Sequence, residues 1–179
     1  MRTFVAVEIS NENVIDSIRD FQSKISFQAK PVALQNLHFT LQFLGEISEE
    51  NCEKIKQNLK TIEFQSFKIN FKGVGAFPNM RSPRVVWIGV DDVGAKKLEK
   101  LANEVKNALK PLEFSPDKPF KSHITIFRIK NKIGNITKDL ENFKTCDFGN
   151  QIVSNFKLKQ SVLTPKGPVY SDLEEIIAK

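Results

Sequence analysis

One pattern occurs twice along this chain and limits the folds open to it: an apolar strand, an amphipathic helix, a loop, and a second strand that carries a histidine. The first copy ends in the strand around His38, and the second ends in the strand around His123. These are the only two histidines of the chain. Because a repeated pattern of this kind is typical of an internal duplication, we expect one bilobal domain over residues 1–179, built from interlocked halves of about 1–80 and 81–179.

The periodicity of apolar residues predicts the elements of both halves. The expected strands are 3–9, 37–45, 67–74, 85–90, 123–129 and parts of 152–163. The expected helices are 11–21, 48–60, 94–109 and a weaker one at 137–143. Ser10 is the expected N-cap of the first helix, because its hydroxyl can accept a hydrogen bond from the first helical turn. After a turn at 164–168 we expect only a short tail.

The charge balance favours phosphate-bearing partners, although a solvated lysine-rich surface explains it equally well. The chain has 27 Lys and Arg against 21 Asp and Glu, which gives a net charge of +6. Cys52 and Cys146 are too few for a disulfide scaffold and lack metal-ligand spacing. Because Glu8 interrupts the first apolar run and no apolar stretch reaches the ~20 residues of a membrane span, we expect a soluble cytoplasmic protein.

Each histidine is followed two positions later by a threonine, in a strand of apolar residues. The two segments are His38-Phe39-Thr40-Leu41 and His123-Ile124-Thr125-Ile126. Because alternate side chains of a strand point to the same face, each half offers one imidazole and one hydroxyl to one surface. The residues expected behind them, in the core, are Phe39, Leu41, Phe43, Ile124 and Ile126. If the halves face each other, the two surfaces form an approximately symmetric pocket.

Such a pocket suits phosphoryl transfer at a phosphodiester. One neutral imidazole can take a proton from an attacking water or ribose hydroxyl, while the other, protonated, gives a proton to the departing oxygen. An unperturbed histidine has a pKa of about 6.5, so both forms are accessible near neutral pH. Thr40 and Thr125 can donate hydrogen bonds to the non-bridging oxygens. No metal is required, and a zinc site built on His38 and His123 would lack its remaining ligands.

These motifs resemble the repeated H-x-T-x signature of the 2H phosphoesterase superfamily, and most closely its prokaryotic RNA 2′,3′-cyclic phosphodiesterase branch, also called the 2′-5′ RNA ligase family. The likeness covers nearly the whole chain. Besides the histidine motif at 38–45, it includes the opening strand at 1–7 and the segments 83–90 and 163–170. The resemblance implies a bilobal α+β fold. In that fold two pseudo-twofold-related antiparallel sheets line a central basic cleft, and the helices lie outside.

The resemblance also implies an activity. It is the hydrolysis of 2′,3′-cyclic phosphate RNA ends to 2′-phosphates, without a metal or cofactor. Apart from the resemblance, we expect a monomer. The reverse reaction would join RNA ends, such as those of tRNA halves, through a 2′-5′ linkage, which would give the protein a role in tRNA processing. By analogy with related enzymes, His38 is the proton donor to the departing 3′ oxygen and His123 is the base that activates water. The equivalence of the two halves leaves the reverse assignment open, and cleavage of the 2′ bond instead would yield a 3′-phosphate.

Further candidates for substrate binding are Arg128, Arg84 and Tyr170. Arg128 stands where the family carries an arginine after its second motif, but a regular strand would point it away from His123. Either the strand bends or ends before it, or Arg128 reaches phosphate from the rim, or its role is structural. Arg84, with Arg81 beside it, would contact the RNA backbone or lie in a solvated loop. Tyr170 and Phe77 are candidates for stacking on a terminal base.

Two other functions compete with this one. A non-catalytic RNA-end binding module could keep the motifs as a phosphate pocket, although binding alone does not need two proton-transfer groups. A 2H phosphodiesterase for a small cyclic nucleotide or a 2′-5′ oligonucleotide would share the chemistry. The basic charge balance favours a polynucleotide mildly. A structural role for both histidines is disfavoured by their matching contexts.

Overall fold

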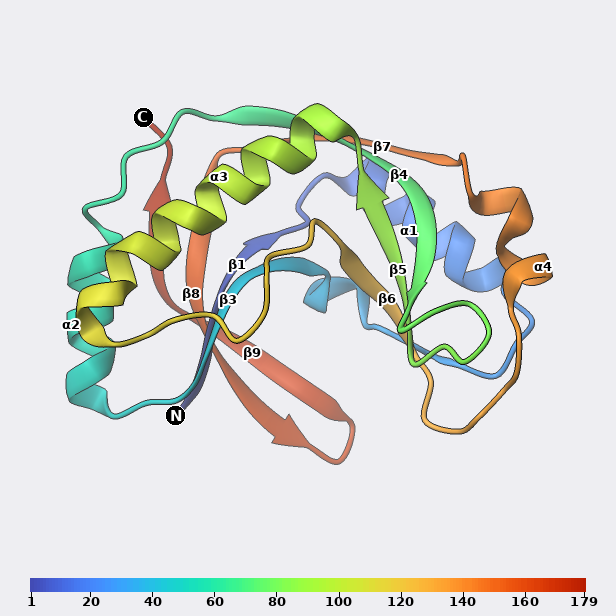
Figure 1. The fold of residues 1–179 in the computed structure, drawn as a ribbon, viewed down its shortest axis with the longest axis horizontal. Helices are drawn as coiled ribbons and strands as arrows, with labels where there is room; N and C mark the ends of the chain where they lie inside the picture. The colour runs from blue at the N-terminus through green and yellow to red at the C-terminus, as the bar shows by residue number, and fades with distance from the viewer.

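The computed structural model describes all 179 residues and contains two antiparallel sheets that lie next to each other with helices on their outer sides (Figure 1). The first sheet has the order β3-β1-β8-β9, with bounds His38–Glu46, Arg2–Glu8, Asn155–Thr164 and Gly167–Ile177. The second sheet has the order β2-β6-β5-β4-β7, with bounds Lys30–Pro31, Ile124–Arg128, Val85–Val90, Phe67–Phe77 and Asp147–Val153. The helices are α1 (Glu12–Lys24), α2 (Glu49–Leu59), α3 (Asp92–Leu109) and α4 (Thr137–Leu140).

The two halves exchange helices. Helix α1 follows β1 of the first sheet but packs on β6 and β7 of the second, whereas α3 follows β5 of the second sheet and packs on β3 of the first as well as on β4. The C-terminal strands β8 and β9 complete the first sheet beside β1. A single cluster of 38 buried hydrophobic residues joins these layers, so neither half has a core of its own.

Apolar stripes and side-chain caps account for the main helices. In α3, Leu98, Leu101 and Leu109 are fully buried or nearly so, as their helical spacing predicts. The first helix begins one residue later than expected, because Asn11 is its N-cap and accepts hydrogen bonds from the second and third residues after it. The prediction for Ser10 was wrong: its backbone N–H donates to Gln151 instead. None of the helices combines the length and the hydropathy that a membrane crossing requires.

The segment expected as a short tail is the long strand β9. It pairs with β8 from Asn155–Ile177 to Thr164–Gly167, and the two strands form a hairpin that extends beyond the body of the first sheet (Figure 1). The apolar pattern did not predict this strand, because several of its positions are charged. Asp172 contacts two lysines of β8, and such opposite-charge pairs across a sheet stabilise it as apolar pairs do.

Strands β3 and β6 each contain a bulge at the equivalent place after the threonine. In β3, Thr40 is opposite Ala6 and Gln42 is opposite Val5, so Leu41 is the extra residue. A bulge of this kind breaks the alternation of faces. Leu41 and Gln42 are therefore both buried, and Phe43, which we expected in the core, is 66% exposed.

The bulge in β6 has the same consequence for Arg128. Thr125 is opposite Trp87 and Phe127 is opposite Val86, which leaves Ile126 as the extra residue. Arg128 then lies opposite Val85, on the same face of the sheet as Thr125. Of the alternatives left open by the sequence, the structure selects the bent strand.

Candidate active site

His38 is the first residue of β3, and both of its ring nitrogens have partners. The Nδ1 atom lies 2.7 Å from the carbonyl oxygen of Asn36, and Nε2 lies 3.0 Å from Oγ1 of Thr40. Because a carbonyl oxygen only accepts, Nδ1 must carry the hydrogen. In the neutral ring Nε2 is therefore the nitrogen that can take up a proton, and it points to the face that Thr40 shares.

His123 lies just before β6 and is held in the same way. Its Nδ1 atom is 2.9 Å from the carbonyl oxygen of Lys121, which is again the residue two positions earlier. The hydrogen is thus on Nδ1, and Nε2 is free for proton transfer. Thr125 shares this face but makes no hydrogen bond to the ring. The strands that carry the two histidines, β3 and β6, contact each other across the two sheets.

Aromatic rings flank both imidazoles. The ring of His38 lies 5.0 Å from Phe4 and 5.5 Å from Tyr170 between centroids. The ring of His123 lies 4.9 Å from Phe77 in an edge-on arrangement and 6.5 Å from Trp87. The structure therefore brings Tyr170 to the first histidine and Phe77 to the second. Such rings restrict the orientation of each imidazole and keep water away from its sides.

Burial lowers the pKa of both histidines. For His38, burial is opposed by the hydrogen bond to Asn36, while the positive charges of Lys159 and Arg128 lower the pKa further. For His123, burial is likewise opposed by the bond to Lys121. Both rings are consequently neutral at neutral pH more often than an exposed histidine would be.

This lowering predicts an acidic pH optimum. If the two histidines act as an acid–base pair, the reactive form has one neutral and one protonated imidazole and is most abundant between the two pKa values of the pair. Because both values lie below their usual value of about 6.5, we expect kcat/KM to be bell-shaped with its maximum below that pH and to fall as the pH rises further. Initial rates across the pH range measure this profile, and a maximum on the alkaline side of neutrality would contradict it.

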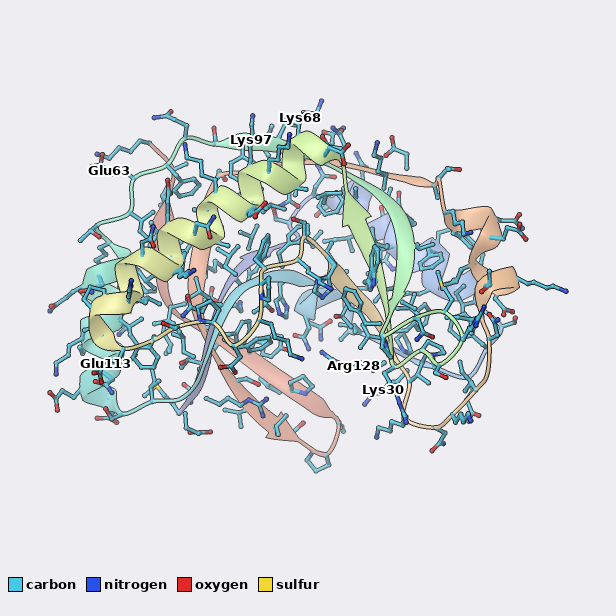
Figure 2. All side chains as sticks on the ribbon, viewed as in Figure 1. Lys30, Glu63, Lys68, Lys97, Glu113 and Arg128 are labelled. Carbon is cyan, nitrogen blue, oxygen red and sulfur yellow. The ribbon has the colours of Figure 1, made fainter.

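Arg128 belongs to the second sheet, but its charge acts on residues of the first. Its positive charge lowers the pKa of His38, and burial raises the pKa of Tyr170 while Arg128 opposes that rise. The guanidinium is exposed and has no carboxylate partner. Figure 2 shows Arg128 and its cross-strand neighbour Lys30 close together beside β6. Its free planar donors suit a phosphate.

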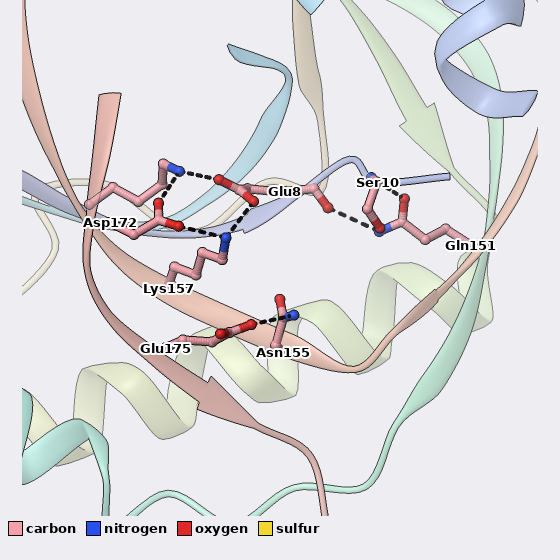
Figure 3. A network of polar contacts seen from close by, with 8 residues as sticks. Glu8, Ser10, Gln151, Asn155, Lys157, Asp172 and Glu175 are labelled. Carbon is pink, nitrogen blue, oxygen red and sulfur yellow. Dashed lines mark hydrogen bonds and ion pairs between the residues drawn. The ribbon is translucent and has the colours of Figure 1, made fainter. Parts of the chain in front are cut away.

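Four charged side chains form a network on the first sheet (Figure 3). Lys157 contacts Glu8 at 2.9 Å and Asp172 at 2.7 Å, and Lys159 contacts the same two carboxylates. Glu8 is directly opposite His38 in the strand register, and its charge raises the pKa of His38 whereas that of Lys159 lowers it. No sequence motif predicted this network. The alternation of Lys157 and Lys159 in β8 was its only visible signal.

The second histidine depends on a glycine that makes room for Trp87. A Cβ atom built on Gly75 would lie 2.1 Å from Cζ2 of Trp87, so the indole lies flat on the glycine. We expect Gly75→Ala to displace Trp87, to lower the free energy of unfolding by about 1–3 kcal/mol, and to disturb His123. Denaturant unfolding measures the loss.

The control for this prediction is the double variant Gly75→Ala with Trp87→Phe. The smaller phenyl ring removes the atoms that clash with the new methyl group, so the methyl should cost less in this background. Equal costs of Gly75→Ala in both backgrounds would show that the indole does not limit this site.

Arg84 does not join the histidines directly. It precedes Val85, the residue opposite Arg128, and its Nη1 donates to the carbonyl oxygen of Lys130 at 3.0 Å. Arg81 lies in the exposed turn before it. No group of three or more His, Cys, Asp or Glu side chains is arranged to hold a metal ion.

The chain is similar to a known protein family and to several proteins of solved structure. The family model described as LigT like Phosphoesterase matches the chain over residues 7–87 and 88–170. An Archaeoglobus fulgidus protein named RNA 2′,3′-cyclic phosphodiesterase is 46% identical over 175 residues, 97% of this chain and 98% of that protein. The crystal structure of TT0787 of Thermus thermophilus has a TM-score of 0.83 at 33% identity, covering 99% of this chain and 97% of that one. That of E. coli LigT complexed with 3′-AMP has a TM-score of 0.80 at 26% identity, covering 99% and 98%.

These neighbours and the two antiparallel sheets confirm the α+β fold that the histidine motifs implied. The similarity extends over nearly the whole chain in each case. It therefore includes both strands that carry a histidine and the hairpin that carries Tyr170.

Proposed function

Because this chain belongs to the LigT-like phosphoesterase family, we propose that it is an RNA 2′,3′-cyclic phosphodiesterase that uses His38 and His123 as an acid–base pair. The observation that carries the proposal is the matching geometry of the two rings. Each has Nδ1 bound to the carbonyl two residues earlier, and each shares a face with a threonine. Nε2 is thus the reactive nitrogen in both.

The proposed reaction needs one proton to enter and one to leave the phosphodiester. His123 takes a proton from water through Nε2 as the water oxygen forms a bond to phosphorus. The bond between phosphorus and the 3′ oxygen breaks, and protonated His38 gives its proton to that oxygen. The product carries a 2′-phosphate and a free 3′-hydroxyl. Thr40 and Thr125 donate hydrogen bonds to the non-bridging oxygens, where negative charge is concentrated.

RNA is the proposed substrate class. The A. fulgidus relative carries the name RNA 2′,3′-cyclic phosphodiesterase, and E. coli LigT has been crystallised with a nucleotide, 3′-AMP. The net charge of +6 fits a polyanion. With a 5′-hydroxyl in place of water as the nucleophile, the same proton transfers join it to the phosphorus of a 2′,3′-cyclic phosphate as the 3′ oxygen departs, so 2′-5′ ligation of RNA ends such as tRNA halves belongs to the proposal. So does a monomer working in the cytoplasm, where free cysteines such as Cys52 and Cys146 stay reduced.

The test is product analysis with a short RNA that ends in a 2′,3′-cyclic phosphate, in the presence of EDTA. We expect the wild-type protein to convert it to the 2′-phosphate, and His38→Ala and His123→Ala to bind the RNA without converting it. Tight binding without conversion by the wild-type protein would favour the RNA-end binding module. Conversion of a mononucleotide cyclic phosphate alone would favour the small-nucleotide enzyme.

A further inference from the structure

Positive charge without matching negative charge gathers at one end of the second sheet. Residues 78–84 and 128–138 contain no acidic residue. Their arginines and lysines make no ion pair with a carboxylate, whereas some lysines elsewhere, such as Lys54 and Lys60, do. The cations of this end are Arg81, Arg84, Arg128, Lys130, Lys132 and Lys138. Uncompensated cations in one region attract a polyanion, and they do so independently of its sequence.

A cavity of about 260 Å³ lies among these cations. Arg84 and Lys132 line it together with Ser82, Pro83 and Ile133. The bond from Arg84 to the Lys130 carbonyl fixes one wall, and two of the five lining side chains are cationic. The cavity therefore has room for a phosphate group and offers it two cationic side chains.

The cavity adjoins the proposed active site along the backbone. Arg84 is followed by Val85, which is opposite Arg128, and the N–H of Ile129 donates to the Arg84 carbonyl at 2.9 Å. In the pairing of β5 with β6, the wall of the cavity thus begins at Arg84, one residue beyond the pair formed by Val85 and Arg128.

We propose that the cavity between Arg84 and Lys132 binds a backbone phosphate upstream of the reacting end, and that the enzyme therefore prefers an RNA strand to a mononucleotide. The proposal rests on the function proposed above. A 2′,3′-cyclic phosphate closes the 3′ end of RNA, so the rest of the strand leaves the site through the 5′ oxygen of the same ribose. A mononucleotide has no such continuation and gains nothing from the cavity.

The experiment compares two substrates that share the reacting group: adenosine 2′,3′-cyclic phosphate and a short oligoadenylate that ends in the same cyclic phosphate. We expect Lys132→Gln to lower kcat/KM for the oligonucleotide roughly tenfold and to leave the mononucleotide unchanged. The slope of log kcat/KM against log salt for the oligonucleotide should become shallower by about 0.7, as expected for one lost phosphate contact on a single strand. Lys132 is the cleaner position because Arg84 also holds the loop.

Lys97→Gln is the matched control. It removes the same charge from an exposed position of α3, away from the Arg128 end of the molecule (Figure 2), and should change neither substrate. If Lys132→Gln slows both substrates equally, or neither, the inference is wrong although the enzyme remains a phosphodiesterase. If the wild-type protein hydrolyses neither, the activity is wrong. The inference then stands or falls on whether Lys132→Gln weakens binding of an oligoadenylate that carries a 2′-phosphate.

Discussion

Replacing His38 or His123 with asparagine is expected to lower kcat for an RNA 2′,3′-cyclic phosphate about a hundredfold to ten-thousandfold, the usual contribution of a general acid or base. Asparagine keeps a polar side chain at the position but cannot carry a proton between water and the phosphodiester. KM should change little, because the phosphate contacts proposed for Arg128, Thr40 and Thr125 are left in place. Single-turnover rates with saturating enzyme measure the chemical step apart from product release.

The pH profiles of these two variants assign the roles. A base loses activity when it is protonated, so His123→Asn should remove the acidic limb of the bell. An acid loses activity when it is deprotonated, so His38→Asn should remove the alkaline limb. The opposite pattern would exchange the two roles, and a full bell in both variants would show that neither histidine transfers a proton.

The histidine motifs were visible in the sequence because their geometry is local. A residue and the second one after it share a face of any strand, and each ring is fixed by a carbonyl two positions earlier. Nothing distant is needed to place His38 with Thr40 or His123 with Thr125. The strands themselves followed from apolar patterns in the same way, and 85–90 matches β5 at both ends.

Phe43 shows where this reasoning fails. Alternation places it in the core, but the extra residue Leu41 turns it outward. The bulge is fixed by how β3 pairs with β1, and pairing with a strand so far back along the chain leaves no mark in the segment itself. Phe43 and Arg128 both lie five residues after their histidine. A prediction that placed a bulge after each threonine would therefore have put both side chains on the correct face of their strands.

The charge network beside His38 was invisible for a related reason. Glu8, Lys159 and Asp172 come from three strands, and each alone reads as an ordinary surface residue. Lys159 is nevertheless buried, because both carboxylates compensate its charge in place of water. Only the strand order β1-β8-β9 brings them together. The same order brings Tyr170 to His38, which turns a residue near the chain end into part of the site.

Arg128→Ala is expected to lower kcat/KM about tenfold to a hundredfold, the loss that corresponds to one hydrogen-bonded contact with a charged group. The bulge at Ile126 directs its guanidinium to the face of Thr125, and its charge already acts on His38 across the two sheets. A phosphate held between the histidines would therefore have Arg128 within reach. The loss should appear with the mononucleotide and with the oligonucleotide alike, because Arg128 is assigned to the reacting phosphate. Equal losses with both substrates would distinguish Arg128 from Lys132, whose replacement should slow only the oligonucleotide.

Two further variants separate a specific contact from general attraction. Lys30 is the cross-strand neighbour of Arg128, so Lys30→Gln removes one nearby positive charge without removing the guanidinium. If Arg128 acts by binding phosphate with its planar donors, Lys30→Gln should cost much less than Arg128→Ala, and Arg128→Lys should recover only part of the activity. Equal losses in Lys30→Gln and Arg128→Ala, with full recovery in Arg128→Lys, would mean that the site needs only positive charge at this edge. In that case the bulge that directs Arg128 to the face of Thr125 would matter for the fold and not for the reaction.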